Sequence, residues 1–455
     1  MDTATNSSVA SLRYISYNMH GFKSNWHYLQ SLLDVNDIVC VQEHWLPSCD
    51  LHRLHSLHSD FVAYGRSSMD DKYEHGLLRG RPFGGVAAFV RKSFNNMVSF
   101  CSSSDDGRII CLKVITSSIN MLLFACYFPV CDSSTQYVNS LTRLLGFIDS
   151  IINTNPGYKI CVLGDLNFEC NDNNPGYVLY KQFSEKYNLV SCDNLVGNDA
   201  FTYNHASLGH RSFLDHVFIS QDVKSCIDKF EILYDGSNLS DHHPVSFCQS
   251  VTIPVSSSTS VNSPKKFYDY RCDMGNTDLY YFLTGDALNG ICHDFSCDIF
   301  DNVCVSHDHR IDINIYYNEL VHILTSAADA SIPVVPKQAM KHYWSATLND
   351  LKMNSKDTYE LWMLSGKPKN GYVFDIMKDA KYKYKLAVRD AIRSYEDHFS
   401  DDLLKHLSSK EMNAFWRTWS AKTCKKVLSI NCIDGVSNDY DIAEIFRKKF
   451  TFNGT

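Results

Sequence analysis

The sequence predicts an α/β domain over residues 12–249, followed by a mostly helical region over residues 267–455. Two observations predict this fold class. Short apolar runs that are typical of buried strands recur through the first region and alternate with segments of helical spacing. Residues 250–266 are rich in Ser, Thr and Pro, which predicts a linker between the two regions. Residues 1–11 are expected to form a disordered tail.

The first expected strands end in polar side chains. Residues 12–17 alternate as a strand does and lead directly to Asn18. Residues 38–42, IVCVQ, predict a buried strand, and Glu43 follows it at once. Side-chain packing is a poor explanation for the Glu43 carboxylate directly after a buried strand. It is either a solvated strand end or a metal ligand, because hard divalent cations prefer carboxylate oxygen.

Further buried strands are expected along the first region. One of them ends at Tyr127, just before Pro129, where the ring could pack or the hydroxyl could bond a phosphate oxygen. The expected strands are residues 86–91, 109–114 and 121–127, and the expected helices are residues 26–33, 137–152 and 178–187.

The stretch Tyr158–Phe168, YKICVLGDLNF, is the most informative part of the chain. Its apolar run is long enough for a buried strand, and Gly164 ends it. Asp165 and Asn167 then stand at the mouth of the strand. They either close the strand as an Asx turn or supply reactive groups on a rigid support.

Two later stretches place acids beside histidines. Residues 213–219, FLDHVFI, predict a strand with Asp215 in its middle, and a buried charge there needs a partner. Asp241 and His242 then precede another apolar run. A carboxylate that fixes and charges an imidazole is a recognisable catalytic arrangement.

Several chemistries are excluded by what the sequence lacks. It has no Gly-rich phosphate loop, no CxxC pair and no Ser nucleophile elbow. The remaining chemistry is metal-assisted attack of water on a phosphoester. Single, scattered cysteines, 17 in all, favour a reducing compartment over a disulfide framework. We therefore expect a protein of the nucleus or cytoplasm that is not secreted and has no membrane partner.

Seven motifs stand in the order in which a known superfamily carries them: SYNMHGF, CVQEHWL, FGGVAAFV, CYFP, GDLN, SFLDHVF and SDHHPV. On these motifs residues 12–249 resemble the exonuclease–endonuclease–phosphatase superfamily. QEHWL and GDLN are most similar to the endonuclease of non-LTR (LINE-type) retrotransposons. The chain also ends where the reverse transcriptase of such a polyprotein would begin, so it resembles a truncated copy. The resemblance implies a four-layer α/β sandwich, with two facing sheets flanked by helices.

The resemblance also implies roles for individual residues. Glu43, with Asn18 nearby and Asp241 in support, would hold Mg²⁺, with Mn²⁺ as an alternative. Asp165 would orient the attacking water, and Asn167 and Tyr127 would bond the phosphate. Asp215 would orient His242, which would stabilise the transition state, and Ser212 would contact substrate.

Two departures argue against an abasic-site repair enzyme. His20 stands where many repair members carry Asp, and Val130 stands where they carry Asn.

The C-terminal third is basic, with 21 Lys and Arg against 15 Asp and Glu over residues 331–455, although the whole chain has a net charge of −8. Residues 380–397 predict a helix with basic and aromatic side chains interleaved. This face is either solvated or contacts nucleic acid, DNA first and RNA as an alternative. Trp416 and Trp419 are expected in the core. The candidate DNA-binding residues are Lys381, Lys383, Lys385 and Arg389.

The leading functional hypothesis is a Mg²⁺-dependent DNA endonuclease that nicks one strand and leaves a 3′-hydroxyl. Two alternatives stay open. One is a catalytically silent nucleic-acid-binding remnant, and the other is a phosphatase that acts on a small phosphoester.

Overall fold

The computed structural model describes most of the chain, and these residues divide into two compact units. One unit contains the residues up to 255 together with those from 343 onward, and the other contains residues 256–342. The described residues are 7–74, 77–132, 134–197, 199–205, 210–254, 268–270, 275–290, 307–336 and 343–423.

The first unit is built on two six-stranded sheets. One has the strand order β15-β16-β1-β2-β6-β3 and the other the order β11-β14-β10-β9-β8-β7. The strands of the first sheet are β1 (Ser7–Asn18), β2 (Ile38–Gln42), β3 (Phe61–Arg66), β6 (Val86–Arg91), β15 (Ile227–Ile232) and β16 (Val245–Pro254). The strands of the second are β7 (Val98–Ser103), β8 (Ile109–Ile115), β9 (Asn120–Tyr127), β10 (Lys159–Asp165), β11 (Leu189–Ser191) and β14 (Asp215–Ser220).

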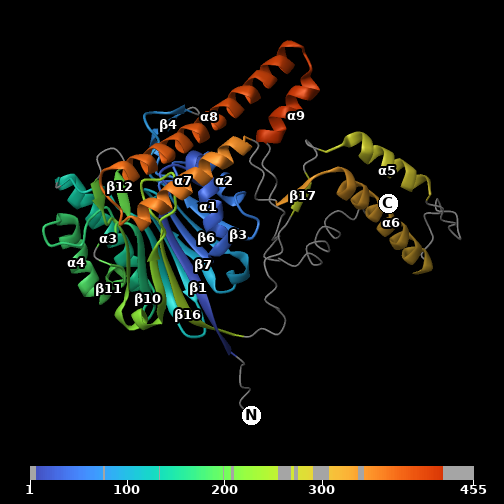
Figure 1. Cartoon of the computed structure of the whole chain (residues 1–455). Helices are drawn as coiled ribbons and strands as arrows, with labels where there is room; N and C mark the ends of the chain where they lie inside the picture. Colours follow the sequence, from blue (N-terminus) through green and yellow to red (C-terminus); the bar gives the residue numbers. More distant parts are fainter. Residues whose placement is uncertain are drawn as a thin grey trace. The chain divides into compact units, whose positions relative to one another are not determined.

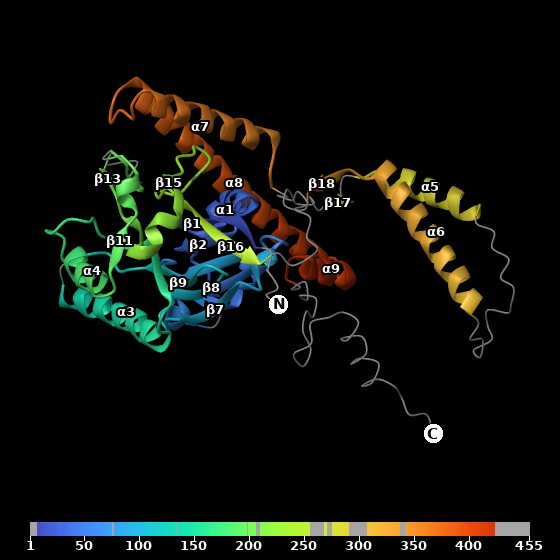
Figure 2. The ribbon, with the colours of Figure 1, turned by 90° about the horizontal axis from the view of Figure 1, so that it is seen from below.

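The sheets face each other, and helices cover their outer faces (Figures 1 and 2). Successive side chains of a strand point to opposite faces, so Tyr14 enters the core between the sheets while Ile15 packs under helices. The covering helices are α1 (Phe22–Val35) and α2 (His52–His55) on the first sheet and α3 (Thr135–Thr154) and α4 (Pro175–Lys186) on the second. The expected four-layer α/β sandwich is confirmed.

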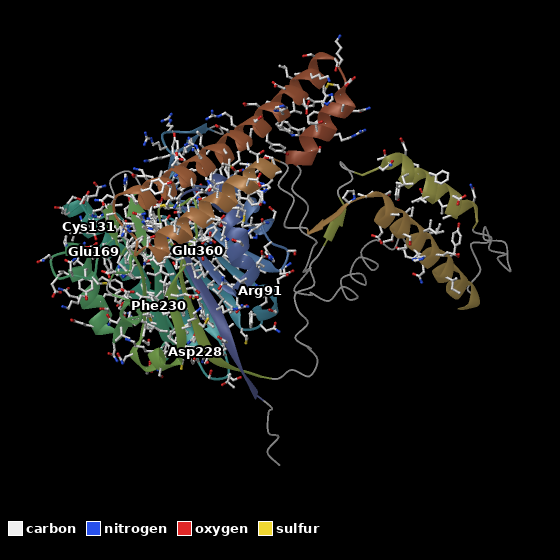
Figure 3. The ribbon with its side chains drawn as sticks, in the orientation of Figure 1. Arg91, Cys131, Glu169, Asp228, Phe230 and Glu360 are labelled. Atoms are coloured by element: carbon white, nitrogen blue, oxygen red, sulfur yellow. The ribbon has the colours of Figure 1, made fainter. Side chains whose placement is uncertain are left out.

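Arg91, the last residue of β6, forms a hydrogen bond to α1 and so holds this helix against the sheet (Figure 3). Its Nη2 donates to the carbonyl of Leu33 at 2.8 Å, and its Nε lies 3.3 Å from Asp37 Oδ1. The last carbonyls of a helix have no partner within the helix, so this arginine satisfies one of them and fixes where α1 ends.

Some boundaries differ from the sequence prediction. β1 begins at Ser7, inside the expected tail, and β16 continues to Pro254, inside the expected linker. Asp215 begins β14 instead of lying in the middle of a strand, because the backbone N–H groups of Leu214 and Asp215 both donate to Thr202 Oγ1 at 2.9 Å. β3, β7, β11 and β15 were not expected, and each forms the edge of a sheet.

Three C-terminal helices belong to the same unit as the sheets: α7 (Ala346–Leu364), α8 (Tyr372–Ser408) and α9 (Met412–Thr423). Trp362 of α7 is 0% exposed and packs with Phe201, and Tyr384 of α8 packs with Leu239. The helices therefore share apolar clusters with the loops of the sandwich. The expectation that Trp416 and Trp419 lie in the core is wrong. They are 55% and 42% exposed, because α9 packs along α8 and not into a core cluster.

Among its described residues, the second unit contains two helices, α5 (Thr277–Asn289) and α6 (His307–Ser331), and a short antiparallel pair, β17 (Tyr268–Tyr270) with β18 (Val334–Pro336). Two further hairpins lie in the first unit: β4 (Tyr73–Glu74) with β5 (Leu77–Leu78), and β12 (Tyr203–His205) with β13 (His210–Ser212). Within the described residues, none of the helices has the length and apolar character needed to span a membrane.

Candidate active site

The strand order brings polar side chains together at one end of the sandwich. β1 and β2 are parallel, as are β9 and β10, so Asn18 and Glu43 meet at one edge and Tyr127 and Asp165 at the other. Asp215 is directly opposite Asp165 in the antiparallel register. Gly164 makes this edge possible, because its φ is +142° and an added Cβ would lie 1.9 Å from the carbonyl oxygen of Cys126. Only glycine allows β9 and β10 to approach so closely there.

Asn18 joins the two sheets at this end. It is 0% exposed, and its Nδ2 donates to Glu43 Oε1 at 3.0 Å and to Asp165 Oδ2 at 2.8 Å. Its Oδ1 accepts from the backbone N–H of His20 at 3.1 Å. A single amide therefore holds a carboxylate from each sheet at a fixed separation.

The loops around these residues adopt a backbone that L-residues rarely use. Glu43 and Asn167 both have φ near +53°, and His20 and Trp45 have φ values of +46° and +55°. Such positions cost on the order of 1 kcal/mol each and persist where the surroundings hold them. Here hydrogen bonds hold them: Trp45 Nε1 donates to Glu43 Oε2 at 3.0 Å, and Asn167 Nδ2 donates to the carbonyl of Phe128 at 2.9 Å.

His242 is clamped between two carboxylates from the second sheet. Its Nδ1 donates to Asp215 Oδ2 at 2.7 Å, and its Nε2 lies 3.9 Å from Asp165 Oδ2. Burial alone would lower the pKa of His242, but Asp215 and Asp165 together raise it to about 10. The imidazole is therefore protonated at neutral pH. Since 3.9 Å is too long for a hydrogen bond, its Nε2–H can donate to a substrate oxygen.

Burial acts on Asp165 in the opposite direction from His242: it raises the pKa of the carboxyl group. Burial raises its pKa to about 7, with contributions from Asp215 and Glu43, while His242 works against the increase. Its Oδ1 accepts from the backbone N–H of Asn167 at 3.1 Å. A buried carboxylate whose pKa is raised above its ordinary value is suited to accept a proton from water.

Two predicted residues lie at the rim of this group. Asp241 Oδ1 is 3.1 Å from His20 Nδ1. Burial would raise the pKa of Asp241, but His20 and His242 hold it well below its ordinary range. Burial and the nearby Glu43 raise the pKa of Tyr127, so its hydroxyl keeps its proton and can donate.

Several supporting residues were missed by sequence reasoning. Thr202 anchors the start of β14, and the ring of Tyr203 packs on His242 with centroids 5.0 Å apart. Ser240 Oγ donates to the carbonyl of Asn18 at 2.8 Å and accepts from the backbone N–H of His242 at 3.1 Å. Ser240 is the first residue of the SDHHPV motif, so the motif could have identified it as a site residue. Thr202 and Tyr203 carry no such signal in the sequence.

Ser212 and Val130 lie outside the central group. Ser212 is opposite Tyr203 in the β12–β13 hairpin, and its Oγ is 3.2 Å from His210 Nδ1. Ser212 is therefore paired through the backbone with Tyr203, whose ring packs on His242. Val130 is 67% exposed, so it supplies no polar group to the site.

The donor atoms of Glu43 fit a hard divalent cation. Both carboxylate oxygens accept one hydrogen bond from a neutral donor, Asn18 or Trp45. Within the described residues no Lys, Arg or His forms an ion pair with Glu43. A partly buried carboxylate with lone pairs left over and no counter-ion favours Mg²⁺ or Mn²⁺. Ligand atoms of Asp165, Asp215 and His242 also lie within 4.8 Å of one another, but the hydrogen bond between Asp215 and His242 already uses two of them.

A cavity of about 590 Å³ lies between α8 and Asp241, at the rim of this site. Asp241 and Ser240 line one side of it, and basic residues spaced three or four apart on α8 line the other. These basic residues are Lys378, Lys381, Lys385 and Arg389. Lys381 Nζ donates to the carbonyl of Ser240 at 3.3 Å, and burial together with Lys385 lowers the pKa of Lys381 to about 8. Lys383 does not line the cavity and instead pairs with Asp379 at 2.7 Å.

Comparison with known proteins identifies the family to which this chain belongs. Residues 15–242 match the Endonuclease/Exonuclease/phosphatase family. Among curated proteins, no sequence matches the chain.

The solved structures that are similar to this chain share little of its sequence. The AP endonuclease LMAP of Leishmania major is 13% identical, with 52% of this chain and 87% of that one covered and a TM-score of 0.42. The 3′ phosphatase NExo of Neisseria, bound to a product DNA hairpin, is 16% identical over 52% and 98% of the chains, with a TM-score of 0.41. The endonuclease domain of TRAS1, a telomere-specific non-LTR retrotransposon, is 14% identical over 52% and 98%, with a TM-score of 0.38.

Proposed function

The chain belongs to the Endonuclease/Exonuclease/phosphatase family, whose members are metal-dependent phosphoesterases and nucleases, and from this premise we propose that it is a DNA endonuclease. It hydrolyses one phosphodiester of a duplex with a divalent cation and leaves a 3′-hydroxyl. The observation that carries the proposal is the buried His242, which is held by Asp215 and faces Asp165 across 3.9 Å.

The protein groups divide the reaction between them. Asp165 orients the attacking water and accepts its proton, because its raised pKa places it near the working pH. Asn167 and Tyr127 donate to the scissile phosphate. His242 donates Nε2–H to the oxygen on which negative charge develops, and such preorganised donors stabilise the transition state.

Glu43 would hold the cation, with Asn18 fixing the carboxylate and Asp241 supporting that side of the site. When bound, a divalent cation neutralises the developing charge on the phosphate. We propose Mg²⁺, with Mn²⁺ as the alternative, because the donors are oxygen atoms.

The basic face of α8 favours a polymer over a small phosphoester. Lys381, Lys385 and Arg389 lie along the cavity that Asp241 borders, so a strand whose phosphate lies in the site can continue along them. A small phosphoester would leave these cations without partners. We therefore propose DNA as the substrate, and no observation favours RNA.

The QEHWL and GDLN motifs support a finer assignment, target-site nicking of the kind that non-LTR retrotransposons use. In that setting the 3′-hydroxyl would prime reverse transcription. The proposal concerns the nick alone, because priming needs a polymerase.

The deciding experiment compares supercoiled plasmid with p-nitrophenyl phosphate as substrates, with Mg²⁺ or Mn²⁺ present. We expect open circles whose nicks a DNA polymerase extends, and no release of nitrophenol. Release of nitrophenol without nicking would favour the small-phosphoester alternative. DNA binding without either reaction would favour the silent remnant.

Glu43→Gln is the matched variant for this experiment, since the amide keeps the volume and loses the charge that holds the cation. Nicking should be abolished while the melting temperature stays unchanged. Undiminished nicking by this variant would remove Glu43 from the metal site.

A further inference from the structure

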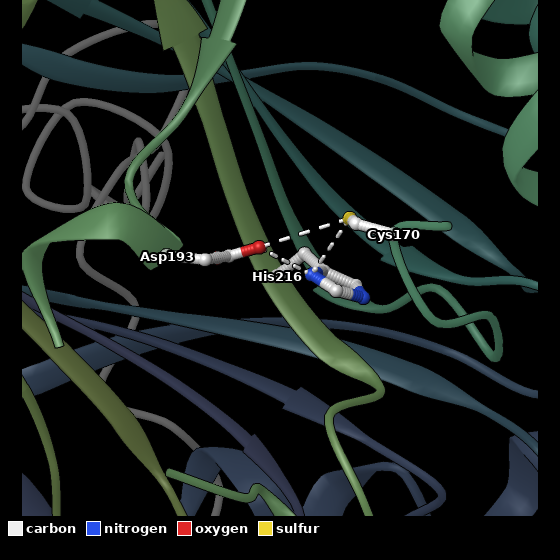
Figure 4. Close-up of side chains that lie close together, drawn as sticks. All are labelled: Cys170, Asp193 and His216. Atoms are coloured by element: carbon white, nitrogen blue, oxygen red, sulfur yellow. Dashed lines mark hydrogen bonds and ion pairs between the residues drawn. The ribbon is translucent and has the colours of Figure 1, made fainter. Parts of the chain in front are cut away.

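Three side chains that could bind a metal meet on the back of the strand that carries Asp215. Successive residues of β14 point to opposite faces, so His216 points away from the catalytic group and packs on Phe168, with ring centroids 5.2 Å apart. Cys170 approaches from the loop after β10, and Asp193 from the short 3₁₀ helix η4 (Asp193–Leu195) (Figure 4).

The distances among these atoms are close to those in a tetrahedral metal site. Cys170 Sγ lies 3.6 Å from His216 Nδ1 and 3.8 Å from Asp193 Oδ2, and Nδ1 lies 2.7 Å from Oδ2. Ordinary Zn²⁺ bond lengths would separate these pairs by about 3.6, about 3.6 and about 3.4 Å. Two of the separations already fit. The third is the His216–Asp193 contact, which a bound cation would replace after the carboxylate withdraws by about 0.7 Å.

Hydrogen bonding fixes which histidine nitrogen is the ligand. His216 Nε2 lies 2.7 Å from the carbonyl oxygen of Phe168, and a carbonyl only accepts, so Nε2 carries the hydrogen. This is how metal-binding histidines are commonly oriented. Nδ1 is then the ring nitrogen that faces Asp193 Oδ2, at 2.7 Å, and Cys170 Sγ, at 3.6 Å.

Asp193 supplies an independent sign that a partner is missing from this group. Its second carboxylate oxygen, Oδ1, is buried and has no hydrogen-bond partner among the described residues. Buried polar atoms nearly always have one, so the orphaned oxygen of this carboxylate, whose other oxygen Oδ2 contacts the thiol and the imidazole, points to an additional ligand there.

We propose that Cys170, Asp193 and His216 bind a zinc-type cation. A thiolate, an imidazole and a carboxylate select a borderline-soft metal, unlike the oxygen donors around Glu43. Cys170 is exposed, which leaves the fourth position to water. Binding releases the thiol proton and any proton on Nδ1. The cation ties the loop that follows Asp165 and Asn167 to the strand that begins with Asp215, so it braces the catalytic residues from behind.

Co²⁺ is the probe for this site, because a thiolate–cobalt bond gives an intense charge-transfer absorption in the near ultraviolet. The reduced, chelator-treated full chain should develop this band with one equivalent of Co²⁺, and Zn²⁺ should remove it. Cys170→Ser should abolish the band without harming the fold, since the side chain is exposed. Cys49→Ser, at another exposed cysteine, should retain it.

Glu43→Gln separates this site from the proposed catalytic one. That variant should keep the cobalt–thiolate band while it loses nicking, so either proposal can fail without the other. In addition, Zn²⁺ should raise the melting temperature of the wild type but not of Cys170→Ser. The absence of the band in the wild type, or an equal band in Cys170→Ser, would overturn the zinc site.

Discussion

His242 and Asp215 form one chemical unit, although His242 lies in the loop before β16 of the first sheet and Asp215 begins β14 of the second. The carboxylate holds the ring through Nδ1 at 2.7 Å and is the strongest of the charges that raise the pKa of His242. Removal of the ring removes the donor to the phosphate. Removal of the carboxylate charge both misorients the ring and allows it to lose its proton earlier.

Single-turnover nicking by three variants tests this coupling. His242→Ala should lose on the order of 10²–10³ in rate, as other electrostatic donors do. Asp215→Asn should move the alkaline limb of the pH–rate profile to lower pH, because the pKa of His242 falls from about 10 when its partner loses its charge. The double variant should be little slower than His242→Ala alone. Losses that multiply would show that the two residues act independently.

The same ion pair makes stability depend on pH. The pKa of His242 is about 10 in the folded protein against 6.5 for the ordinary side chain, so the folded state binds this proton more tightly. The resulting stabilisation is complete below pH 6.5 and is lost as the pH rises through about 10. The difference in unfolding free energy between wild type and His242→Gln should therefore shrink across this window. Denaturant titrations at several pH values measure it, and a difference that grows with pH would contradict the assignment.

At the scale of strands, the pairing of β9 with β10 depends on Gly164. Gly164→Ala should destabilise the protein by about 2–5 kcal/mol, from the strained φ and the clash with Cys126 together. Gly146→Ala is the matched control, since Gly146 is exposed in the middle of α3 with no atom within 4 Å of an added Cβ. It should be neutral or stabilising by about 0.5–1 kcal/mol. Equal effects in thermal melts would mean that strand proximity does not require glycine at position 164.

At the scale of helices, the salt dependence of DNA binding tests the basic face of α8. Lys385→Ala and Arg389→Ala should each reduce the slope of log affinity against log salt by about 0.9 for duplex DNA, because each would remove one phosphate contact. Lys383→Ala is the control on the same helix, since Lys383 pairs with Asp379 and does not line the cavity. If all three variants have the wild-type slope, α8 presents only a solvated face.

The strands that the sequence predicted are more deeply buried than the strands that it did not predict. The central strands read as continuous apolar runs because they are covered on both faces, as in β2 and β10. The four edge strands of the two large sheets were not predicted, because their residues alternate between buried and exposed or are partly exposed, as in β3 and β7. The central polar residues could be found because they lie at or next to the ends of buried strands: Asp165 ends β10, Glu43 follows β2 and Asp215 begins β14. Thr202 and Tyr203 could not, since their roles arise only when β12 is brought against His242.

At the scale of the whole molecule, the C-terminal helices are part of the sandwich unit and not a separate appendage. Ser355 Oγ of α7 donates to the carbonyl of Gly236 at 2.7 Å, and Tyr384 Oη of α8 lies 3.2 Å from His27 Nε2. Arg211 Nη1 donates to the carbonyl of Lys367 at 3.1 Å. These contacts connect α7 to the loop that leads to Asp241 and His242, α8 to α1, and the turn between α7 and α8 to β13.

A pair of tryptophans tests whether these helices and the sandwich unfold together. Trp362→Ala should lower the unfolding free energy by about 3–5 kcal/mol, because the ring is 0% exposed and packs with Tyr359 and Phe201. Nicking activity and helical signal should then be lost together at the same lowered temperature. Trp416→Ala, at a ring that is 55% exposed on α9, should stay within about 0.5 kcal/mol of wild type. If Trp362→Ala lowers the helical transition while nicking survives to the wild-type temperature, the sandwich is stable without α7 and α8. In that case its active site does not depend on them.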